Sequence, residues 1–149
     1  MNGATWSALG AVYHREGRLQ DEVKAWQRAA GLLRLPDREL LSLGYAELDA
    51  QQPRQALRAF DRSASLRSQS ARASDNSFLA NLARGRARAW SELGDMQRAI
   101  SFQEETVRLV PDSALDWLEL ARLYDREQRS QDAQRALDRA TGMQRGQKP

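Results

Sequence analysis

Histidine and cysteine, on which many catalytic and metal sites depend, are scarce in this sequence. Its 149 residues include one histidine, His14, and no cysteine. A catalytic triad, a zinc site and an HExxH helix all need more of these side chains or a different spacing. No GxxxxGK[ST] phosphate loop and no GxGxxG fingerprint is present. The sequence therefore predicts a protein that is not an enzyme, with no catalytic residue, no metal ligand and no cofactor.

Arginine carries the strongest chemical signal in the chain. The 23 basic residues are all arginine except Lys24 and Lys148, and the formal net charge is +3 with a pI of about 9.8. A planar guanidinium matches a carboxylate or a phosphate with two hydrogen bonds, so this excess favours contacts with anions. The alternative is codon bias in a GC-rich genome, with the arginines on solvated faces beside the 20 acidic residues.

Two of these arginines are spaced so that they could bind an anion together. Arg84 and Arg88 are four residues apart and would share one face of a helix. Adjacent cations repel each other, and their convergence is favourable if an anion lies between them. The alternative is that both point to solvent and pair with Glu92 or Glu119.

The elements that would position these side chains are helices. The chain is rich in Ala, Leu, Arg, Gln and Glu, which are strong helix formers, and poor in β-branched residues. This composition predicts an all-α fold, and the length fits one domain. No apolar run approaches the roughly 20 residues needed to span a membrane. The N-terminus lacks a basic stretch followed by an apolar core, so no signal peptide is visible in this sequence.

The sequence repeats itself with a period of 34 residues. The residues that recur at this interval are Trp6 and Leu40, Leu9 and Leu43, Gly10 and Gly44, Trp26 and Phe60, Ala83 and Trp117, Trp90 and Tyr124, Ala99 and Ala133, and Leu109 and Met143. Pro36 and Pro111 each end one repeat, because proline cannot continue a helix. From Ala56 to Ala99 the interval is 43 residues, which indicates an insertion at about 71–79.

The pattern Trp6-x-x-Leu9-Gly10-x-x-Tyr13-x-x-x-Gly17 resembles the first-helix signature of the tetratricopeptide repeat (TPR) family. The resemblance implies a right-handed α-solenoid of four helix-turn-helix repeats, within a single TPR domain spanning 1–149. The expected repeats span about 3–36, 37–70, 80–113 and 114–147. Repeats of this kind build binding surfaces rather than catalytic sites.

Several positions depart from the pattern. Gly17 and Gly94 occupy the turns inside the first and third repeats, where a left-handed cap favours glycine. The other two turns hold Gln51-Gln52-Pro53 and Gln128-Arg129-Ser130. Glu22 takes the place of a small alanine, so either the first helix pair is splayed or Val23 and Ala25 take over the contact.

The insertion at 71–79 has two interpretations. It is either a longer loop or an added wall beside a groove with Phe78 at its lip, and Ser74 or Asp75 would cap the helix that follows.

In the resembled family, the first helices of successive repeats line a concave groove. Carried over to this chain, the resemblance implies an apolar strip on the second repeat and a mainly basic group on the third and fourth. The residues expected to contact a partner are Leu41, Tyr45, Leu48, Asn81, Arg84, Arg88, Leu118 and Arg122. The Lys and Asn clamp with which some members hold a chaperone tail is absent, because its positions hold Ser7, Ala11 and Ser42.

These observations predict a non-catalytic protein-protein interaction module. The expected partner is a protein or peptide segment with acidic residues and an apolar anchor, bound in the concave groove. Self-assembly through an exposed end of the solenoid is one alternative. Nucleic-acid binding is a weaker one, because the arginines are interspersed with acidic residues and the four tryptophans fall on core positions.

We also expect a soluble, monomeric bacterial protein of the cytoplasm or periplasm, without a membrane span. Because Trp6 already belongs to the first repeat, we expect it to be a domain of a larger protein.

Overall fold

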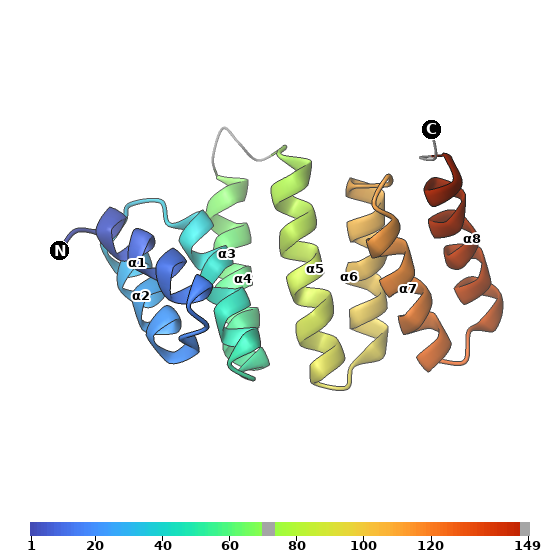
Figure 1. Cartoon of the computed structure of the whole chain (residues 1–149), viewed down its shortest axis with the longest axis horizontal. Helices are drawn as coiled ribbons and strands as arrows, with labels where there is room; N and C mark the ends of the chain where they lie inside the picture. The colour runs from blue at the N-terminus through green and yellow to red at the C-terminus, as the bar shows by residue number, and fades with distance from the viewer. Residues whose placement is uncertain (70–73, 147–149) are drawn as a thin grey trace. The chain divides into compact units, whose positions relative to one another are not determined.

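The structure is a computed structural model that describes residues 1–69 and 74–146. Within these ranges all regular secondary structure is helical, which confirms the predicted all-α class. The eight helices are α1 (Gly3–Arg15), α2 (Leu19–Leu32), α3 (Asp37–Asp49), α4 (Pro53–Ser68), α5 (Asn76–Glu92), α6 (Met96–Leu109), α7 (Ala114–Arg126) and α8 (Ser130–Gly146). They pack as consecutive pairs, α1 with α2, α3 with α4, α5 with α6 and α7 with α8 (Figure 1).

The chain divides into two compact units, Met1–Asp75 and Asn76–Pro149. In the first unit α2 also packs against α3, and in the second unit α6 packs against α7. The core of the first unit includes Val23, Leu40, Leu43, Ala46 and Ala59. The core of the second unit includes Ile100, Val107, Leu120, Leu123 and Tyr124, with Trp90 and Trp117 packed against it. Each unit therefore has its own hydrophobic core.

The turn inside every helix pair contains one residue in the left-handed conformation. The φ angles are 67° at Gly17, 58° at Gln51, 84° at Gly94 and 57° at Gln128. In each turn the amide of the following residue donates to a carbonyl five residues earlier, at 2.8–3.0 Å. The two glutamine turns therefore have the same geometry as the two glycine turns, although their sequences depart from the repeat pattern.

A close approach of two helices explains why a glycine and an aromatic residue recur together. A Cβ atom added at Gly10 would lie 2.6 Å from Cε2 of Trp26, and one added at Gly44 would collide with the ring of Phe60. Phe60 is completely buried. The large side chain of the second helix thus packs directly on the backbone of the first helix, where any residue other than glycine would be in the way.

Glu22 is buried in a place where other repeats have alanine. Its side chain is 3% exposed, and the corresponding Ala56 and Ala99 are completely buried. Oε1 of Glu22 accepts a hydrogen bond from Nε1 of Trp26 at 3.3 Å and lies 3.1 Å from Nδ1 of His14. In the first repeat, a polar contact between α1 and α2 therefore stands where the other repeats have a methyl group.

Part of the predicted insertion belongs to a helix. Because α5 begins at Asn76, residues 76–79 form its first turn, whereas 70–73 lie outside the described residues. Phe78 is 7% exposed, so its ring is buried and does not form an exposed lip. This burial contradicts the interpretation of Phe78 as the edge of a groove.

An ion-paired arginine lies at the end of the first unit. Arg67 on α4 is 1% exposed, and its guanidinium lies 3.0 Å from Oδ2 of Asp37 and 3.4 Å from Oδ2 of Asp75. A buried cation needs such partners, because a charge without them would be strongly destabilising. Arg67 therefore links the first turn of α3 to the residue that precedes α5.

Candidate partner-binding site

The residues predicted to contact a partner fall on both units. Leu41, Tyr45 and Leu48 lie on α3 of the first unit. The Tyr45 ring packs edge-on against Phe60, with 5.4 Å between the ring centroids and 74° between the planes. Leu48 is 1% exposed and continues the buried face of Leu40 at helical spacing. The structure therefore corrects the prediction for Leu48, because a core side chain does not meet a partner.

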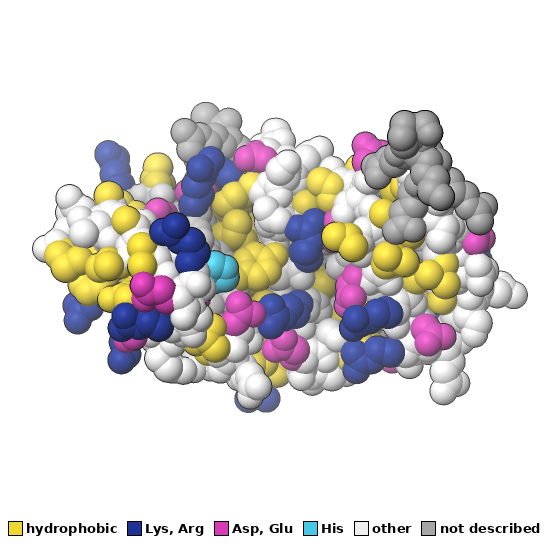
Figure 2. Space-filling view, in the orientation of Figure 1, with side chains coloured by type: hydrophobic (Ala, Val, Ile, Leu, Met, Phe, Trp, Pro, Cys, Tyr) yellow, Lys and Arg dark blue, Asp and Glu magenta, His cyan; other side chains and the backbone are white. Residues whose placement is uncertain are grey.

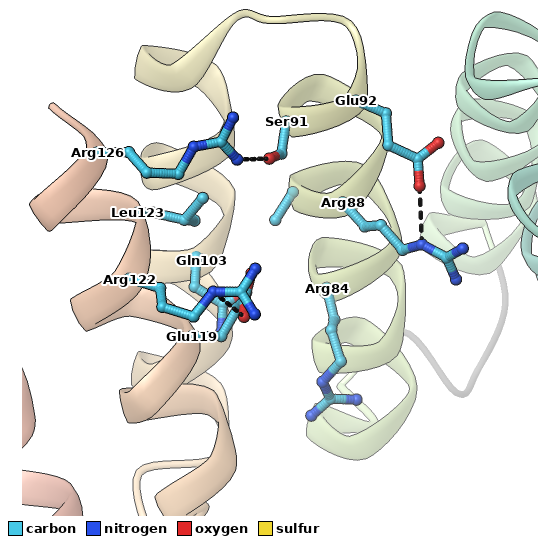
Figure 3. Close-up of a pocket in the computed structure, with 10 residues that line it drawn as sticks. Arg84, Arg88, Ser91, Glu92, Gln103, Glu119, Arg122, Leu123 and Arg126 are labelled. Atoms are coloured by element: carbon cyan, nitrogen blue, oxygen red, sulfur yellow. Dashed lines mark hydrogen bonds and ion pairs between the residues drawn. The ribbon is translucent and has the colours of Figure 1, made fainter. Parts of the chain in front are cut away.

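The other predicted residues lie on α5 and α7 of the second unit, which border a recess of about 670 Å³ (Figure 3). The residues that line it are Arg84, Ala87, Arg88, Ser91, Glu92, Gln103, Glu119, Arg122, Leu123 and Arg126. Three predicted residues, Arg84, Arg88 and Arg122, are among them. Asn81 and Leu118 lie on the same two helices.

The guanidinium group of Arg84 binds other side chains of this protein. Nε and Nη2 donate to Oδ1 and Oδ2 of Asp116, each at 2.7 Å, and Nη1 donates to Oδ1 of Asn81. This two-point contact is the strongest geometry for an arginine–carboxylate pair. Arg84 therefore joins α5 to the first turn of α7, and Asn81 helps to orient the Arg84 guanidinium.

Asp116 is held as a charged carboxylate in a buried position. Its side chain is 6% exposed. Burial alone would raise the pKa of Asp116, but the hydrogen bonds from Arg84 and Ser113 outweigh it and lower the pKa below its usual value. Nε2 of Gln103, from α6, donates to the backbone oxygen of Asp116 at 2.9 Å. Gln103, the polar exception among the second-helix residues, is thus buried because it binds α7.

Arg88 pairs within its own helix. Its Nε donates to Oε1 of Glu92 at 2.9 Å. Figure 3 shows both side chains extending from α5 on the side away from α7. Arg84 and Arg88 therefore do not converge on a common anion. For Arg88, the structure shows the alternative that the sequence left open, which is an ion pair with Glu92.

Two arginines of α7 extend toward α5 (Figure 3). Arg122 is 73% exposed, and its Nε lies 3.5 Å from Oε2 of Glu119. Nη1 of Arg126 donates to Oγ of Ser91 at 3.1 Å. Among the described residues, no carboxylate lies within ion-pair distance of Arg126. Among the arginines that line the recess, those most available to a partner are therefore Arg122 and Arg126.

Sequence reasoning missed Arg126, although a usable signal was present. Arg126 follows Arg122 by four residues, and this spacing places both on one face of α7. The same rule had linked Arg84 with Arg88. What the sequence does not contain is the partner of Arg84, because Asp116 lies 32 residues away along the chain.

Within 1–69 and 74–146, no group of three His, Asp or Glu side chains could hold a metal ion. No helix in this part of the chain is both long and apolar enough to cross a membrane. Figure 2 shows basic side chains interspersed with acidic ones on the face in view, not gathered into one continuous basic patch.

Comparison with known proteins identifies the fold. No protein-family model matches the sequence, and no curated protein matches it either. Solved structures do match. MamA superposes with a TM-score of 0.85 at 18% identity, over 97% of this chain and 80% of MamA. A Podosopora anserina protein with nearly identical TPR-like repeats gives 0.79 at 21% identity, over 98% and 76% of the two chains.

A third solved structure is that of YrrB, described as a TPR protein with an unusual peptide-binding site. It gives a TM-score of 0.76 at 16% identity, over 97% of this chain and 70% of YrrB. Paired helices with a repeating left-handed turn and matches of this extent define a helical-repeat protein. Its fold is that of the tetratricopeptide repeat, as the signature beginning at Trp6 predicts.

Proposed function

We propose that this chain is a non-catalytic protein-interaction module that holds an acidic segment of a partner at the recess between α5 and α7. The TPR fold supports this proposal, because its repeats present extended surfaces to other chains. YrrB, which shares the fold, is described as having a peptide-binding site. Fold alone does not define a ligand, so the choice of partner depends on the side chains of the recess.

The charge balance of the recess carries the proposal. Four arginines and two glutamates line it. Asp116 neutralises Arg84, and Glu92 neutralises Arg88. Arg122 has only a loose, exposed contact with Glu119 at 3.5 Å, a kind of pair that contributes little. The remaining positive charge therefore lies at Arg122 and Arg126, beside the apolar side chains of Ala87 and Leu123.

An acidic peptide fits this surface better than a nucleic acid does. A phosphate backbone presents regularly spaced charges and needs a continuous basic track. Here Glu119 lies beside Arg122 on α7, and Glu92 pairs with Arg88 on α5, so acidic side chains interrupt the basic ones along the lining of the recess. The indole of Trp117 is partly buried and donates to the backbone oxygen of Pro111 at 2.8 Å, so it is not a stacking platform.

We further propose that the module acts as a monomer. The side chains of α8 pair with one another, since Arg135 lies 3.3 Å from Asp132 and Gln134 donates to Asp138 at 2.9 Å. Paired polar side chains on the surface of α8 disfavour stacking of this helix on a second copy of the chain. Light scattering should give one mass that does not change with protein concentration.

The test is a binding experiment with charged polypeptides. Fluorescein-labelled polyglutamate should bind the protein at low salt, and polylysine of equal length should not. The Arg122→Glu/Arg126→Glu variant should lose binding. The Arg135→Glu/Arg139→Glu variant on α8 changes net charge by the same amount and should retain it. Equal loss in both variants, or equal binding of a single-stranded oligonucleotide, would refute an acidic-segment site at the recess.

A further inference from the structure

One face of α7 changes from apolar to basic along the helix. Leu115, Leu118, Arg122 and Arg126 follow one another at helical spacing and therefore form a single stripe. Leu115 is 78% exposed and Leu118 is partly exposed. A single exposed leucine needs no explanation, but here it lies in line with the two available arginines. We call Leu115, Leu118, Arg122 and Arg126 the α7 stripe.

Side-chain bridges between α5 and α7 cross the recess at two levels. Arg84 binds Asp116 near the beginning of α7, and Arg126 binds Ser91 near its end. An α-helix with its side chains is about 10 Å across and would have to displace both bridges to enter. An extended chain can instead lie along the exposed stripe and insert one side chain between the bridges. The bridged recess therefore favours an extended occupant over a helical one.

We propose that the α7 stripe binds an extended peptide with an apolar residue on Leu115 and Leu118 and an acidic side chain at Arg122 and Arg126. This inference rests on the proposed function and adds the conformation and spacing of the partner. A carboxylate can bind these arginines with the bridges in place. The bond to Ser91 uses only Nη1 of Arg126, so Nε and Nη2 can donate to the carboxylate, and such charge-assisted hydrogen bonds are about twice as strong as neutral ones.

The length of the stripe sets the spacing of the motif. Arg122 and Arg126 lie seven and eleven residues beyond Leu115, which at about 1.5 Å per residue is roughly 10 to 16 Å along the helix. An extended chain advances about 3.3 Å per residue. The acidic residue should therefore lie about three to five positions from the apolar one. A helical partner would need a spacing of about seven to eleven positions.

The test uses synthetic peptides of Gly and Ser that carry one leucine and one glutamate. Three designs are compared. The glutamate is adjacent to the leucine in the first, about four positions away in the second and about eight positions away in the third. Each design is made with the leucine before the glutamate and with the glutamate before the leucine. Binding is measured by NMR titration of the backbone amide signals of α5 and α7, which reports weak contacts and can be followed in the arginine variants as well. The four-position peptide should bind at least about three-fold more tightly than the other two, an expectation based on burying one side chain.

Matched controls separate the contributions. Replacement of glutamate by glutamine should abolish the preference, and so should the Arg122→Gln/Arg126→Gln variant. The Arg135→Gln variant should leave it intact, because Arg135 is 74% exposed on α8. All three arginines are exposed, so the variants should fold, and circular dichroism checks this.

The outcomes separate the two proposals. If every acidic peptide binds equally and the α7 variant abolishes binding, the recess still binds acidic segments and the spacing rule is wrong. A preference for the eight-position peptide would indicate a helical partner and overturn the inference. If glutarate or inorganic phosphate binds as tightly as the best peptide, the arginines hold a small anion and no peptide register exists. If no peptide distinguishes the variants from the parent protein, both proposals fail.

Discussion

Glu47 occupies in α3 the place that Tyr13 occupies in α1. The backbone carbonyl of each accepts the hydrogen bond that closes the next turn, from Gln52 N at 2.8 Å and from Arg18 N at 3.0 Å. An arginine stacks on the Tyr13 ring, with 4.5 Å between Cζ of Arg18 and the ring centroid. Glu47 instead places a carboxyl group, 5% exposed, at this buried position. The second repeat thus has an ionisable carboxyl group at the position where the first repeat has the aromatic ring of Tyr13.

Stability should fall as pH rises because of Glu47. Burial raises the pKa of Glu47 from 4.5 to about 7, against the opposing effect of its hydrogen bond with Gln27. Between these two values the folded protein keeps the proton that the unfolded chain releases. The free energy of unfolding should therefore decrease from about pH 5 to about pH 8 by roughly 1–3 kcal/mol for this group. Urea unfolding at both pH values measures it.

The Glu47→Gln variant isolates this contribution from other titrating groups. It should be more stable than the parent protein at pH 8, because it removes a buried charge, and should lose the advantage at pH 5. If both proteins show the same pH dependence, Glu47 is not the cause.

The left-handed turns allow a paired stability test. Gln51 and Gln128 have φ angles of 58° and 57°, and a side chain in this conformation costs about 1 kcal/mol. Gln51→Gly and Gln128→Gly should each raise the free energy of unfolding by roughly 0.5–1 kcal/mol. The reverse changes, Gly17→Gln and Gly94→Gln, should lower it by a similar amount. Thermal unfolding of the four variants provides the comparison, and an opposite sign in either pair would show that other contacts dominate.

Arg84 should prove structural where Arg122 does not. Arg84→Ala leaves Asp116 buried without its main partner and should destabilise the protein by roughly 1–3 kcal/mol. The 38% exposure of Arg84 keeps this value below that of a fully buried pair. Arg122→Ala removes a loose surface contact and should change stability by less than about 0.5 kcal/mol.

A double-mutant cycle with Asp116→Ala measures the coupling between Arg84 and Asp116. Additive losses from the two single substitutions would show that the two-point contact contributes nothing measurable.

Gly44 should tolerate no side chain while Phe60 keeps its place. A Cβ atom at position 44 would collide with the Phe60 ring, so Gly44→Ala should destabilise the protein by roughly 1–3 kcal/mol through overpacking. Combining it with Phe60→Leu should cost less than the sum of the two single changes, because the smaller side chain leaves space. Gly31→Ala is the control, because nothing lies within 4 Å of a Cβ added at Gly31.

The period of 34 residues could be recognised in the sequence because the same packing contact recurs in successive helix pairs. Gly10 and Trp26 recur as Gly44 and Phe60 because one ring lies on one backbone in both pairs. The site was less predictable, because helical spacing relates residues within a helix but not between helices. Arg84 and Arg88 share a helix, yet Arg84 turns to Asp116 on α7 and Arg88 turns to Glu92. The apolar pattern that includes Leu48 is compatible with a groove-lining position and with a core position, and only the burial of Leu48 in the structure assigns it to the core.

The succession of helix pairs also bears on how the chain reaches its fold. The extensive contacts among the described helices all join consecutive helices. Side chains link alternate helices within each unit, as in the Ser7–Glu39 hydrogen bond at 3.2 Å between α1 and α3. Most contacts therefore join residues that are close together in the sequence. Such a low contact order predicts folding in roughly microseconds to milliseconds, starting from any helix pair and spreading to its neighbours.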